Sequence, residues 1–288
     1  MNTTFEDYSI KNNSWQKLSS LYQGTNIRVY KALWRHETVC VKHINFDESE
    51  NICNNNLENE VKILSKCIHP KICQFLGADI KETDVYMVFE FMEHGDLRKY
   101  MSSTSINESR RMEIITDIAK GLCYLHNRKP DVIMHRDLKP ENILINVHGV
   151  AKIADFGLSK LVKVADTKSY QGHTGETGTY TWMSPEVLKH QNYNIKSDIY
   201  SFGLLMYYIW TSKRPFSQQN MTTVQLMFAK LKNKAQLERF ESNAPLFDLV
   251  TRCVQIHPEL RPDIDQVITE LQSIHQRMEE QKQELNSV

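Results

Sequence analysis

The sequence that decides the fold is His-Arg-Asp-Leu-Lys-Pro-Glu-Asn at residues 135–142, followed by Asp-Phe-Gly at residues 155–157. The first stretch combines a carboxylate at Asp137, a cation at Lys139 and an amide at Asn142, and the second begins with another carboxylate. Transfer of a nucleotide γ-phosphate to a hydroxyl group needs such a set. One carboxylate receives the hydroxyl proton, the cation offsets charge on the transferring phosphoryl group, and the amide and the other carboxylate hold Mg²⁺. The pattern therefore predicts a phosphoryl-transfer site.

Length and charge bound the kind of protein. The chain has 288 residues, and its 35 Lys and Arg side chains balance 35 Asp and Glu side chains. This length suits one catalytic unit with two lobes. The neutral balance offers no electrostatic reason to bind nucleic acid or an anionic membrane, so we expect neither as a partner.

The cysteines and the termini predict a cytoplasmic protein. The cysteines are scattered without a Cys-x-x-Cys pair, so reduced, mostly buried thiols are favoured over disulfides or a zinc site. The N-terminus lacks the apolar core of a signal peptide, and Asn2 stands where N-myristoylation requires glycine. The C-terminus has no lipidation cysteine. Residues 199–210 are apolar all round but too few to span a bilayer, so they predict a buried helix.

The first third of the sequence is predicted to be rich in strands, with one helix. Strands are expected at residues 29–34, 38–44 and 85–92. The first two strands enclose a turn at His36-Glu37, and the Asn-rich residues 51–56 predict a loop. An apolar stripe at helical spacing predicts a helix that ends at His69-Pro70; its members are Leu57, Val61, Leu64 and Ile68.

After Gly95 the pattern becomes helical. One stripe, with Ser109 as the expected N-cap, comprises Met112, Ile115, Ala119 and Leu122. The last stripe comprises Ile264, Val267, Ile268, Leu271 and Ile274. From Gln276 the sequence is polar and charged, which predicts a frayed or solvated helix end.

Taken together, these motifs resemble the eukaryotic-type protein kinases over residues 15–275. The resemblance implies an α+β, bilobal protein kinase fold. Its small β-rich lobe with one key helix would span residues 15–92, and its larger, mainly helical lobe would span residues 93–275. An N-terminal extension at 1–14 and a polar tail at 276–288 would flank this domain.

Lys42 and Glu60 are predicted to form an ion pair beside the nucleotide. Lys42 shares one strand face with Cys40, because strand side chains alternate. Glu60 lies near the buried face of its helix, where a carboxylate is costly unless it is paired. In protein kinases such a pair fixes the lysine against the α- and β-phosphates.

The phosphate-covering loop departs from the kinase pattern G-x-G-x-x-G-x-V. Gly24 and Val29 match this pattern, whereas Tyr22 and Ile27 stand where it has glycine. Because glycine lets backbone N–H groups approach phosphates closely, the loop should be stiffer and its fit to a triphosphate looser.

The resemblance also assigns the remaining nucleotide contacts. Phe89 takes the gatekeeper place, with Glu90 and Met92 in the hinge, whose backbone would hydrogen-bond the adenine edge. Apolar side chains would sandwich the adenine ring. The nucleotide-binding residues are thus expected to be Gly24, Val29, Cys40, Lys42, Glu60, Glu90, Met92, Leu144 and Asp155. Asn142 and Asp155 would hold the Mg²⁺.

The substrate class follows from two motifs. Leu-Lys-Pro-Glu-Asn at 138–142 resembles serine/threonine kinases. Gly-Thr-Tyr-Thr-Trp-Met-Ser-Pro-Glu at 178–186 resembles the tyrosine-kinase-like group, which includes Raf-like and mixed-lineage kinases. In this group Thr179 would pair with Lys139 and Asp137.

Other residues of the large lobe are given structural or regulatory roles by the resemblance. Glu186 would form a buried ion pair with Arg261, and Asp198 would anchor the catalytic loop backbone. Arg136 predicts activation by a phosphate on the activation segment, placed there by an upstream kinase or by autophosphorylation, with Thr174 or Thr177 favoured. An apolar column would join the lobes through Leu64, Phe75, His135 and Phe156.

The predicted function is ATP- and Mg²⁺-dependent phosphoryl transfer to serine and threonine hydroxyls of protein substrates, catalysed by Asp137, Lys139 and Asn142. An inactive pseudokinase that acts as a signalling scaffold is the main alternative, because the glycine-rich loop is eroded. Dual specificity that includes tyrosine, and a small-molecule kinase of related fold, also remain open.

Overall fold

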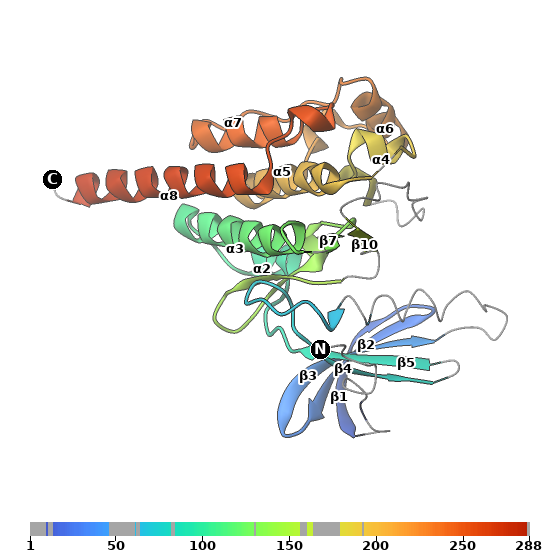
Figure 1. Cartoon of the computed structure of the whole chain (residues 1–288). Helices are drawn as coiled ribbons and strands as arrows, with labels where there is room; N and C mark the ends of the chain where they lie inside the picture. Colours follow the sequence, from blue (N-terminus) through green and yellow to red (C-terminus); the bar gives the residue numbers. More distant parts are fainter. Residues whose placement is uncertain are drawn as a thin grey trace.

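The fold is seen in a computed structural model that describes residues 14–45, 64–81, 84–129, 131–155, 160–163, 179–191 and 193–286, with residues 10 and 61. Figure 1 shows a five-stranded sheet in its lower part and a larger group of helices above it. This arrangement confirms the predicted α+β, bilobal fold, and the two parts are called the small and the large lobe below.

The small lobe is built on one antiparallel sheet. Its strands are β1 (Trp15–Gln23), β2 (Ile27–Trp34), β3 (Glu37–Asn45), β4 (Phe75–Ile80) and β5 (Asp84–Glu90). They run in the order β1-β2-β3-β5-β4. Because side chains alternate along a strand, each face has its own core. Tyr30, Val41 and Val88 pack on the outer face, whereas Ile44 and Met87 join the core that continues into the large lobe.

Three local expectations for the small lobe need correction. The β2–β3 turn lies at Arg35 and His36, one residue earlier than predicted, and both residues have positive φ, as a two-residue hairpin loop requires. Strand β5 ends at Glu90 and not at Met92. Ile68 is 72% exposed and so does not share the buried stripe, whose members Val61 and Leu64 are buried. Residues 67–69 are not helical, so the helix ends earlier than the predicted His69-Pro70, and Leu57 lies outside the described residues.

The large lobe surrounds a buried helix. Its helices are α2 (Leu97–Ser103), α3 (Glu108–His126), α4 (Pro185–Leu188), α5 (Ile195–Thr211), α6 (Thr223–Leu231), α7 (Ala244–Cys253) and α8 (Ile264–Asn286). Helix α5 contacts α3 and α7, and α3 also contacts α8. The side chains of α5 are almost all buried, which confirms the predicted core helix. Within the described parts of the chain, no helix is both long and apolar enough to cross a bilayer.

Short strands form two small sheets in the large lobe, where β7 and β9 contact α3. They are β6 (Gly95–Asp96), β7 (Asp131–Met134), β8 (Ile143–Ile145), β9 (Ala151–Ile153) and β10 (Lys160–Lys163). Strand β8 pairs with β6 and β9, while β7 pairs with β10. Gly95 has a φ of 68° in the turn after the hinge, where a glycine adopts the left-handed conformation without strain.

The ends of two helices differ from the expectation. Asn107, and not Ser109, caps α3, because its side chain accepts a hydrogen bond from the backbone N–H of Arg110. Helix α8 continues through the predicted polar tail to Asn286. This end is more than a solvated helix, since Met278 is buried and its Sδ accepts from Asn243 Nδ2 at 3.3 Å. The domain boundary itself stays a prediction.

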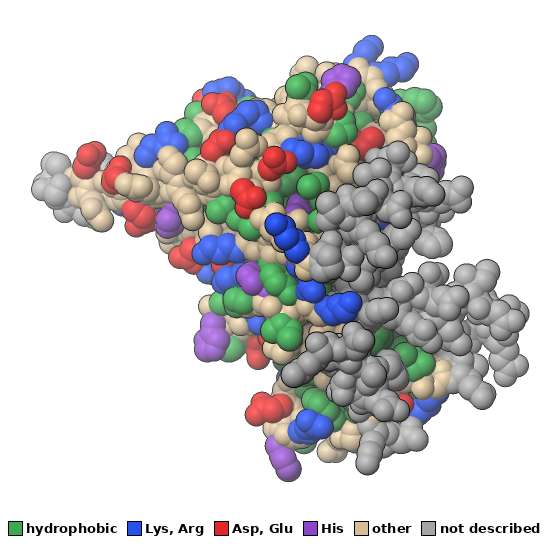
Figure 2. Space-filling view, viewed as in Figure 1, with side chains coloured by type: hydrophobic (Ala, Val, Ile, Leu, Met, Phe, Trp, Pro, Cys, Tyr) green, Lys and Arg blue, Asp and Glu red, His purple; other side chains and the backbone are tan. Residues whose placement is uncertain are grey.

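The surface of the large lobe carries mixed charge. On the face shown in Figure 2, Lys and Arg side chains are interspersed with Asp and Glu over the helices. The neutral charge balance of the sequence is thus spread over this face and not divided into separate acidic and basic patches.

Candidate active site

The two sequence motifs meet because β8 and β9 form a hairpin. Asn142 precedes β8, and Asp155 follows β9 after Ala154. The pairing of Ile143 with Ile153 places the two ends side by side, and Ala154 N–H donates to the Asn142 carbonyl at 2.9 Å. The hairpin therefore brings the amide and the second carboxylate to one edge of the large lobe.

Asp137, Lys139 and Asn142 form one polar cluster. Lys139 Nζ lies 2.8 Å from Asp137 Oδ2, and Asn142 Nδ2 donates to the same oxygen at 2.9 Å. Asn142 Nδ2 also donates to the Asp137 carbonyl at 2.7 Å. The side-chain contacts from Lys139 Nζ and Asn142 Nδ2 both use Oδ2 of Asp137. In the predicted reaction, Oδ1 would therefore be the oxygen that accepts a proton from an acceptor hydroxyl.

Residues 135–142, called the catalytic loop after their predicted role, have their backbone held by Asp198 of α5. The carboxylate accepts the N–H of His135 and the N–H of Arg136, each at 2.9 Å. Arg136 has a φ of 72°, a conformation that costs a non-glycine residue about 1–3 kcal/mol and persists only when its surroundings over-determine it. The anchoring role predicted for Asp198 is therefore seen directly.

Two further side chains satisfy Asp198. His126 Nε2 lies 2.9 Å from Oδ2, and Tyr193 Oη donates to Oδ1 at 2.5 Å. Burial opposes the charge of Asp198, but the hydrogen bond and charge of His126, with the other donors, hold its pKa below the usual value. Arg136 places its guanidinium over the Tyr193 ring, 5.4 Å from the ring centre. These partners keep Asp198 charged inside the lobe.

Lys42 of β3 pairs with Asp155 across the two lobes. Lys42 Nζ lies 3.0 Å from Asp155 Oδ1, and the two side chains are 17% and 47% exposed. The predicted partner Glu60 lies outside the described residues, so the Lys42–Glu60 pair stays a prediction. Asp155 also has a positive φ, of 61°. The contact with Asp155 brings the lysine of the small lobe to the catalytic edge of the large lobe.

The donor groups at this edge suit a magnesium ion that is shared with phosphate. The two hydrogen bonds from Asn142 Nδ2 orient the amide so that Oδ1 is its remaining ligand atom, and the Asp155 carboxylate is half exposed. The described residues contain no group of three or more His, Cys, Asp or Glu that could enclose a metal on their own. Mg²⁺ takes one or two protein oxygens and completes its shell with water and phosphate. The residues present therefore fit the predicted ion.

An apolar cluster lies at the junction of the hinge and the β8–β9 hairpin. Cys73, Met92 and Ala154 are buried there, with Phe89 and Leu144 packed against them. Met92, Leu144 and Phe89 come together as the sequence predicted, whereas Cys73 and Ala154 were missed. Ala154 directly precedes Asp155, so its position in the motif was the signal that could have found it. These side chains form a small buried apolar cluster where the sequence predicts adenine, and apolar side chains of this kind line most ligand sites.

Cys40 and Val29 lie on the sheet face that carries Lys42. Val29 pairs with Lys42, and Lys31 pairs with Cys40, so side chains at these positions share one face. Burial raises the pKa of the Cys40 thiol to about 11, although Lys42 lowers it in part. The thiol therefore remains neutral at physiological pH, which suits a small apolar wall, and its contact with adenine stays a prediction.

Glu90 has a role that the sequence did not show. Lys152 Nζ lies 2.7 and 2.6 Å from its two carboxylate oxygens, and Gln74 N–H donates to Oε1 at 2.7 Å. The side chain thus ties β5 of the small lobe to β9 of the large lobe. The backbone N–H of Glu90 also donates to the Gln74 carbonyl at 3.0 Å, so the predicted contact with adenine would need the Glu90 carbonyl.

The turn between β1 and β2 is tight, and a tyrosine covers it. Gly24 N–H donates to the Ile27 carbonyl at 2.8 Å. A Cβ atom at Gly24 would lie 2.9 Å from Tyr22 Oη and 3.0 Å from its ring, so the phenol ring rests on the glycine. Tyr22 pairs with Val29, which in turn pairs with Lys42, so Tyr22 lies on the face that is predicted to receive phosphates. The departures from the glycine pattern therefore affect the β1–β2 turn, which is predicted to cover the phosphates.

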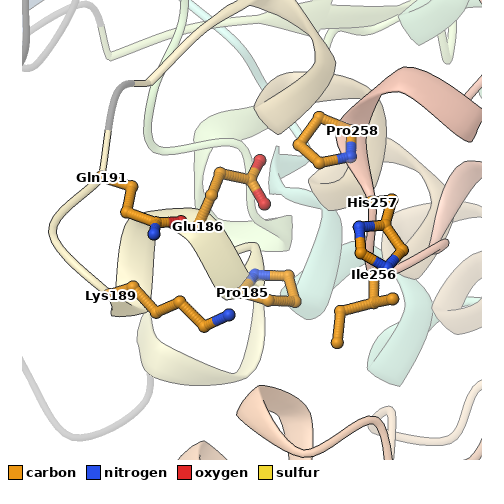
Figure 3. A pocket seen from close by; sticks show the side chains of 7 residues that line it. All are labelled: Pro185, Glu186, Lys189, Gln191, Ile256, His257 and Pro258. Carbon is orange, nitrogen blue, oxygen red and sulfur yellow. The ribbon is translucent and has the colours of Figure 1, made fainter.

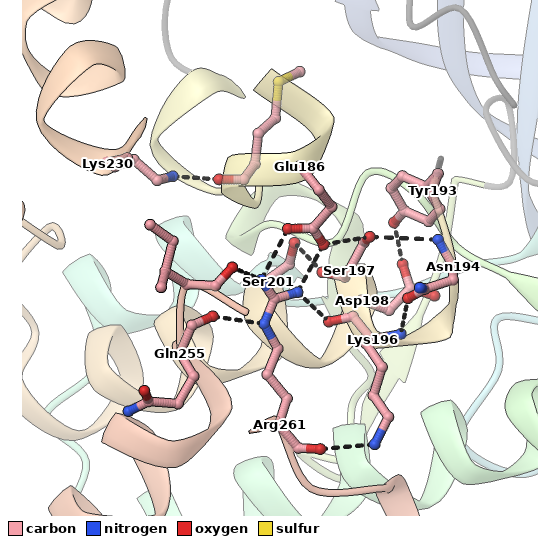
Figure 4. A network of polar contacts seen from close by, with 12 residues as sticks. Glu186, Tyr193, Asn194, Lys196, Ser197, Asp198, Ser201, Lys230, Gln255 and Arg261 are labelled. Atoms are coloured by element: carbon pink, nitrogen blue, oxygen red, sulfur yellow. Dashed lines mark hydrogen bonds and ion pairs between the residues drawn. The ribbon is translucent and has the colours of Figure 1, made fainter. Parts of the chain in front are cut away.

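The predicted ion pair between Glu186 and Arg261 is buried and bidentate. Arg261 Nη1 donates to Oε1 at 2.7 Å and Nη2 to Oε2 at 2.8 Å (Figure 4). Burial acts against the charged form, but the hydrogen bonds and charge of Arg261 hold the pKa of Glu186 below its usual value. A hollow of about 520 Å³ opens beside this pair, where Pro185 of α4 and Lys189, which follows that helix, face His257 and Pro258 (Figure 3). None of the predicted catalytic side chains lines it.

Several predicted residues lie outside the described parts of the chain. They are Phe156, Thr174 and Thr177, and Thr179 is described by its backbone alone. The phosphosites and the Thr179 pairing therefore stay predictions. Of the apolar column, Leu64 and Phe75 lie in the main core, and His135 is fully buried with Nε2 at 2.8 Å from the Ala154 carbonyl.

Comparisons with known proteins agree with this geometry. A family profile described as "Protein kinase domain" matches residues 15–271. The chain is 34% identical over 264 residues to "Serine/threonine-protein kinase VIK" of Arabidopsis thaliana, covering 89% of this chain and 59% of that protein. It is 32% identical over 265 residues to "Serine/threonine/tyrosine-protein kinase HT1" of the same plant, covering 89% of this chain and 65% of that protein.

A third relative comes from another lineage. "Probable serine/threonine-protein kinase drkC" of Dictyostelium discoideum is 33% identical over 260 residues, covering 88% of this chain and 34% of that protein. The chain thus spans less than two thirds of the length of each of these three relatives.

Proposed function

The chain belongs to the protein kinase domain family, within the tyrosine-kinase-like group of serine/threonine kinases that its motifs predicted, and from this premise we propose that it transfers the γ-phosphoryl group of ATP to serine and threonine hydroxyls of proteins. One observation supports this most strongly. The Asp137–Lys139–Asn142 cluster and the Lys42–Asp155 pair place two carboxylates, two cations and an amide at one edge, on a backbone held by Asp198.

The proposed mechanism relies on positioning and electrostatics. Oδ1 of Asp137 orients the acceptor hydroxyl and receives its proton as the bond to the γ-phosphorus forms. Lys139, held on Oδ2 of Asp137, lies where it offsets negative charge on the transferring group. Lys42 aligns the remaining phosphates from the opposite lobe. The bond from the γ-phosphorus to the bridging oxygen breaks, and ADP leaves with the electron pair.

We assign the metal to Asn142 and Asp155. When bound, Mg²⁺ would neutralise phosphate charge, which is the chemistry it supplies in this family. The contribution of the chain is to orient the Asn142 amide through Asp137 and to keep the Asp155 carboxylate beside Lys42.

The acceptor specificity and the regulation are proposals of the same kind. Serine and threonine are favoured by Lys139 and by the names of the relatives VIK and drkC, while the name of HT1 also includes tyrosine. Activation by phosphate at Thr174 or Thr177 would use Arg136, which the catalytic loop already holds. A cytoplasmic location suits the described cysteines, which are free thiols. Nucleic acid and membrane are not proposed as partners.

A signalling scaffold without catalysis is the second candidate. Tyr22 lies on Gly24 on the sheet face of Lys42, which narrows the space for a triphosphate. The complete cluster of Asp137, Lys139 and Asn142 weighs against this candidate, because a scaffold has no need of these orientations.

The test is transfer of radiolabelled γ-phosphate from ATP with Mg²⁺ to the chain itself and to myelin basic protein. The wild type and Asp137→Asn are compared, and phosphoamino-acid analysis identifies the labelled hydroxyl. We expect label on serine or threonine in the wild type alone. Label on tyrosine as well would establish dual specificity. No label in either protein, even after another kinase has phosphorylated the activation segment, would favour the scaffold.

A further inference from the structure

Lys230 is a buried cation that the proposed mechanism does not use. It lies near the end of α6 and is only 2% exposed, although a lysine is rarely buried unless its charge is satisfied. Helix α6 is fixed at its start by a capping box between Thr222 and Gln225. The lysine is therefore fixed in position, and the groups that compensate for burying its charge must be identified.

The ammonium group of Lys230 bonds to backbone carbonyls of one short segment. It donates to the carbonyls of Tyr180 at 3.3 Å and Thr181 at 2.9 Å, and also to the carbonyl of Met183. An ammonium group has three N–H donors, so these three acceptors use its full capacity. Lys230 thus holds together carbonyls of residues 180–183, which begin in the short 3-10 turn η4 (Thr179–Thr181).

The same segment is attached to the helix that holds the catalytic loop. Ser201 Oγ on α5 donates to the Trp182 carbonyl at 2.9 Å, and the Trp182 ring packs edge-on against Tyr208 at 5.9 Å. Asp198, which binds the catalytic loop, lies three residues before Ser201, and residues at this spacing are neighbours on a helix. The segment and the catalytic loop therefore lie beside one turn of α5.

A second basic side chain, Arg214, also contacts this segment. Arg214 Nη2 donates to Thr181 Oγ1 at 2.7 Å, but Arg214 is exposed, whereas Lys230 binds from the protein interior. Figure 4 shows Lys230 in the same region as the Glu186–Arg261 pair, which follows the segment in the chain. Lys230 is therefore the buried attachment between α6 and residues 180–183.

We propose that Lys230 is a positioning residue for the protein substrate, because it fixes the carbonyls of residues 180–183 beside the catalytic loop, where an acceptor segment must lie to reach Asp137. This inference rests on the proposed function, since it concerns the protein acceptor of that reaction. It assigns no contact with ATP to Lys230, so loss of the side chain should affect the protein substrate and not the nucleotide.

The groups around Lys230 make its hold dependent on charge. Burial lowers the pKa of Lys230 to about 7; Glu186 opposes this shift and Arg261 adds to it. The ring of Tyr200 lies 5.0 Å from Nζ, and burial raises the pKa of that phenol, so it stays neutral. The lowered pKa of Glu186 keeps that carboxylate charged near neutral pH, where Lys230 itself titrates. Above its pKa the neutral amine has only two N–H donors for three carbonyls.

The first experiment compares Lys230→Met with Lys232→Met. Both changes remove a lysine near the end of α6, but Lys232 is exposed. In Lys230→Met we expect the KM for myelin basic protein to rise about tenfold, with the KM for ATP within about twofold of wild type. Lys232→Met should leave both constants near the wild-type values. Equal KM values for myelin basic protein in the two variants would overturn the positioning role.

A second readout does not require activity. Amide hydrogen exchange, followed in the peptide that covers residues 180–184, should be faster in Lys230→Met than in Lys232→Met, because the carbonyls lose their donor. If the wild type transfers no phosphate but exchange is faster in Lys230→Met, the proposed function is wrong, whereas the contact of Lys230 with residues 180–183 is supported. If the wild type is active and exchange in Lys230→Met is unchanged, this contact does not stabilise the segment, whereas the proposed function is supported.

The wild-type pH profile keeps the inference testable if Lys230→Met does not fold. The KM for myelin basic protein should rise about threefold as the pH passes from about 6 to about 8, because Lys230 loses its proton. Lys230→Gln, which keeps a shorter neutral donor, should have a raised KM that no longer changes over this range. A wild-type KM that is flat with pH, or a variant that keeps the wild-type profile, would contradict the proposal.

Discussion

The catalytic loop and the β1–β2 hairpin are held in different ways. Asp198, fully buried, accepts two backbone N–H groups of the loop and is itself satisfied by His126 and Tyr193. The hairpin ends in a short turn closed by one hydrogen bond from Gly24, with an exposed Tyr22 lying over it. The catalytic loop is preorganised by a buried hydrogen-bond network, whereas the β1–β2 turn depends on contacts near solvent. The effects of substitutions in the two regions should therefore differ in magnitude and in the quantity that they change.

The largest effect is expected at the centre of the loop. Asp137→Asn should lower the rate of phosphoryl transfer by about 10³-fold, because the proton acceptor is lost while its shape remains. Nucleotide binding should persist, as followed by a fluorescent ATP analogue. Glu141→Gln makes the same change at an exposed site of the same loop and serves as the control. Retained turnover in Asp137→Asn would contradict the role given to this carboxylate.

Next in size is the loss of the buried ion pair that supports the large lobe. Arg261→Met should lower the free energy of unfolding by about 3–5 kcal/mol, because Glu186 stays buried without its partner. Arg252→Met breaks a pair with Glu270 that is 47% and 35% exposed, and such pairs contribute only about 0–1 kcal/mol. Urea unfolding measures both values. Equal losses would remove the distinction between interior and solvent-facing contacts.

A third test concerns the contact between the lobes. Lys42→Ala should lower turnover about 10²-fold, because the phosphates lose the cation that lies 3.0 Å from Asp155. Lys17→Ala, on β1, is the matched control, since Lys17 lies over the Tyr30 ring. Steady-state kinetics at saturating ATP provide the measurement. Unchanged turnover would show that another cation aligns the phosphates.

Acid should weaken the large lobe through its interior carboxylates. The pKa values of Glu186 and Asp198 are held below their usual values by their partners. A carboxyl group with a lowered pKa in the folded state contributes stability above its unfolded pKa, near about 4, and that stability is lost as the pH falls through the folded value. Urea midpoints measured downwards from neutral pH should therefore fall in this acid range. In Glu186→Gln the fall should be smaller than in the wild type, and an equal fall would contradict the assignment.

The smallest effect is expected at the β1–β2 turn. Tyr22→Gly should lower the KM for ATP about threefold with little change in kcat, because the ring leaves the face of Lys42 and the turn regains freedom. Leu21→Gly introduces the same backbone freedom at the neighbouring exposed residue and should not improve ATP binding. A higher KM in Tyr22→Gly would mean that the tyrosine supports the nucleotide.

The sequence pattern predicted most of the site because the chemistry depends on residue types at short spacing. Asp137, Lys139 and Asn142 lie in one short stretch, and the structure brings them together. Local patterns were less reliable at the ends of elements. Asn107 and not Ser109 caps α3, since the cap is the residue whose side chain reaches a free N–H at the first turn. The β2–β3 turn moved by one residue for a similar reason, because the register of Trp34 with Glu37 decides which residues form the turn.

The sequence by itself determined the family, the two-lobed α+β fold and the buried helix α5, and it named the side chains that we propose to be catalytic. Only the tertiary structure showed that Lys152 forms an ion pair with the Glu90 carboxylate and that Lys230 donates to the carbonyls of residues 180–183. These contacts join residues far apart in the chain, and a lone lysine in a helix carries no local sign of its partner. Burial decides such cases, because a charge removed from water must be satisfied by whichever groups the fold places beside it.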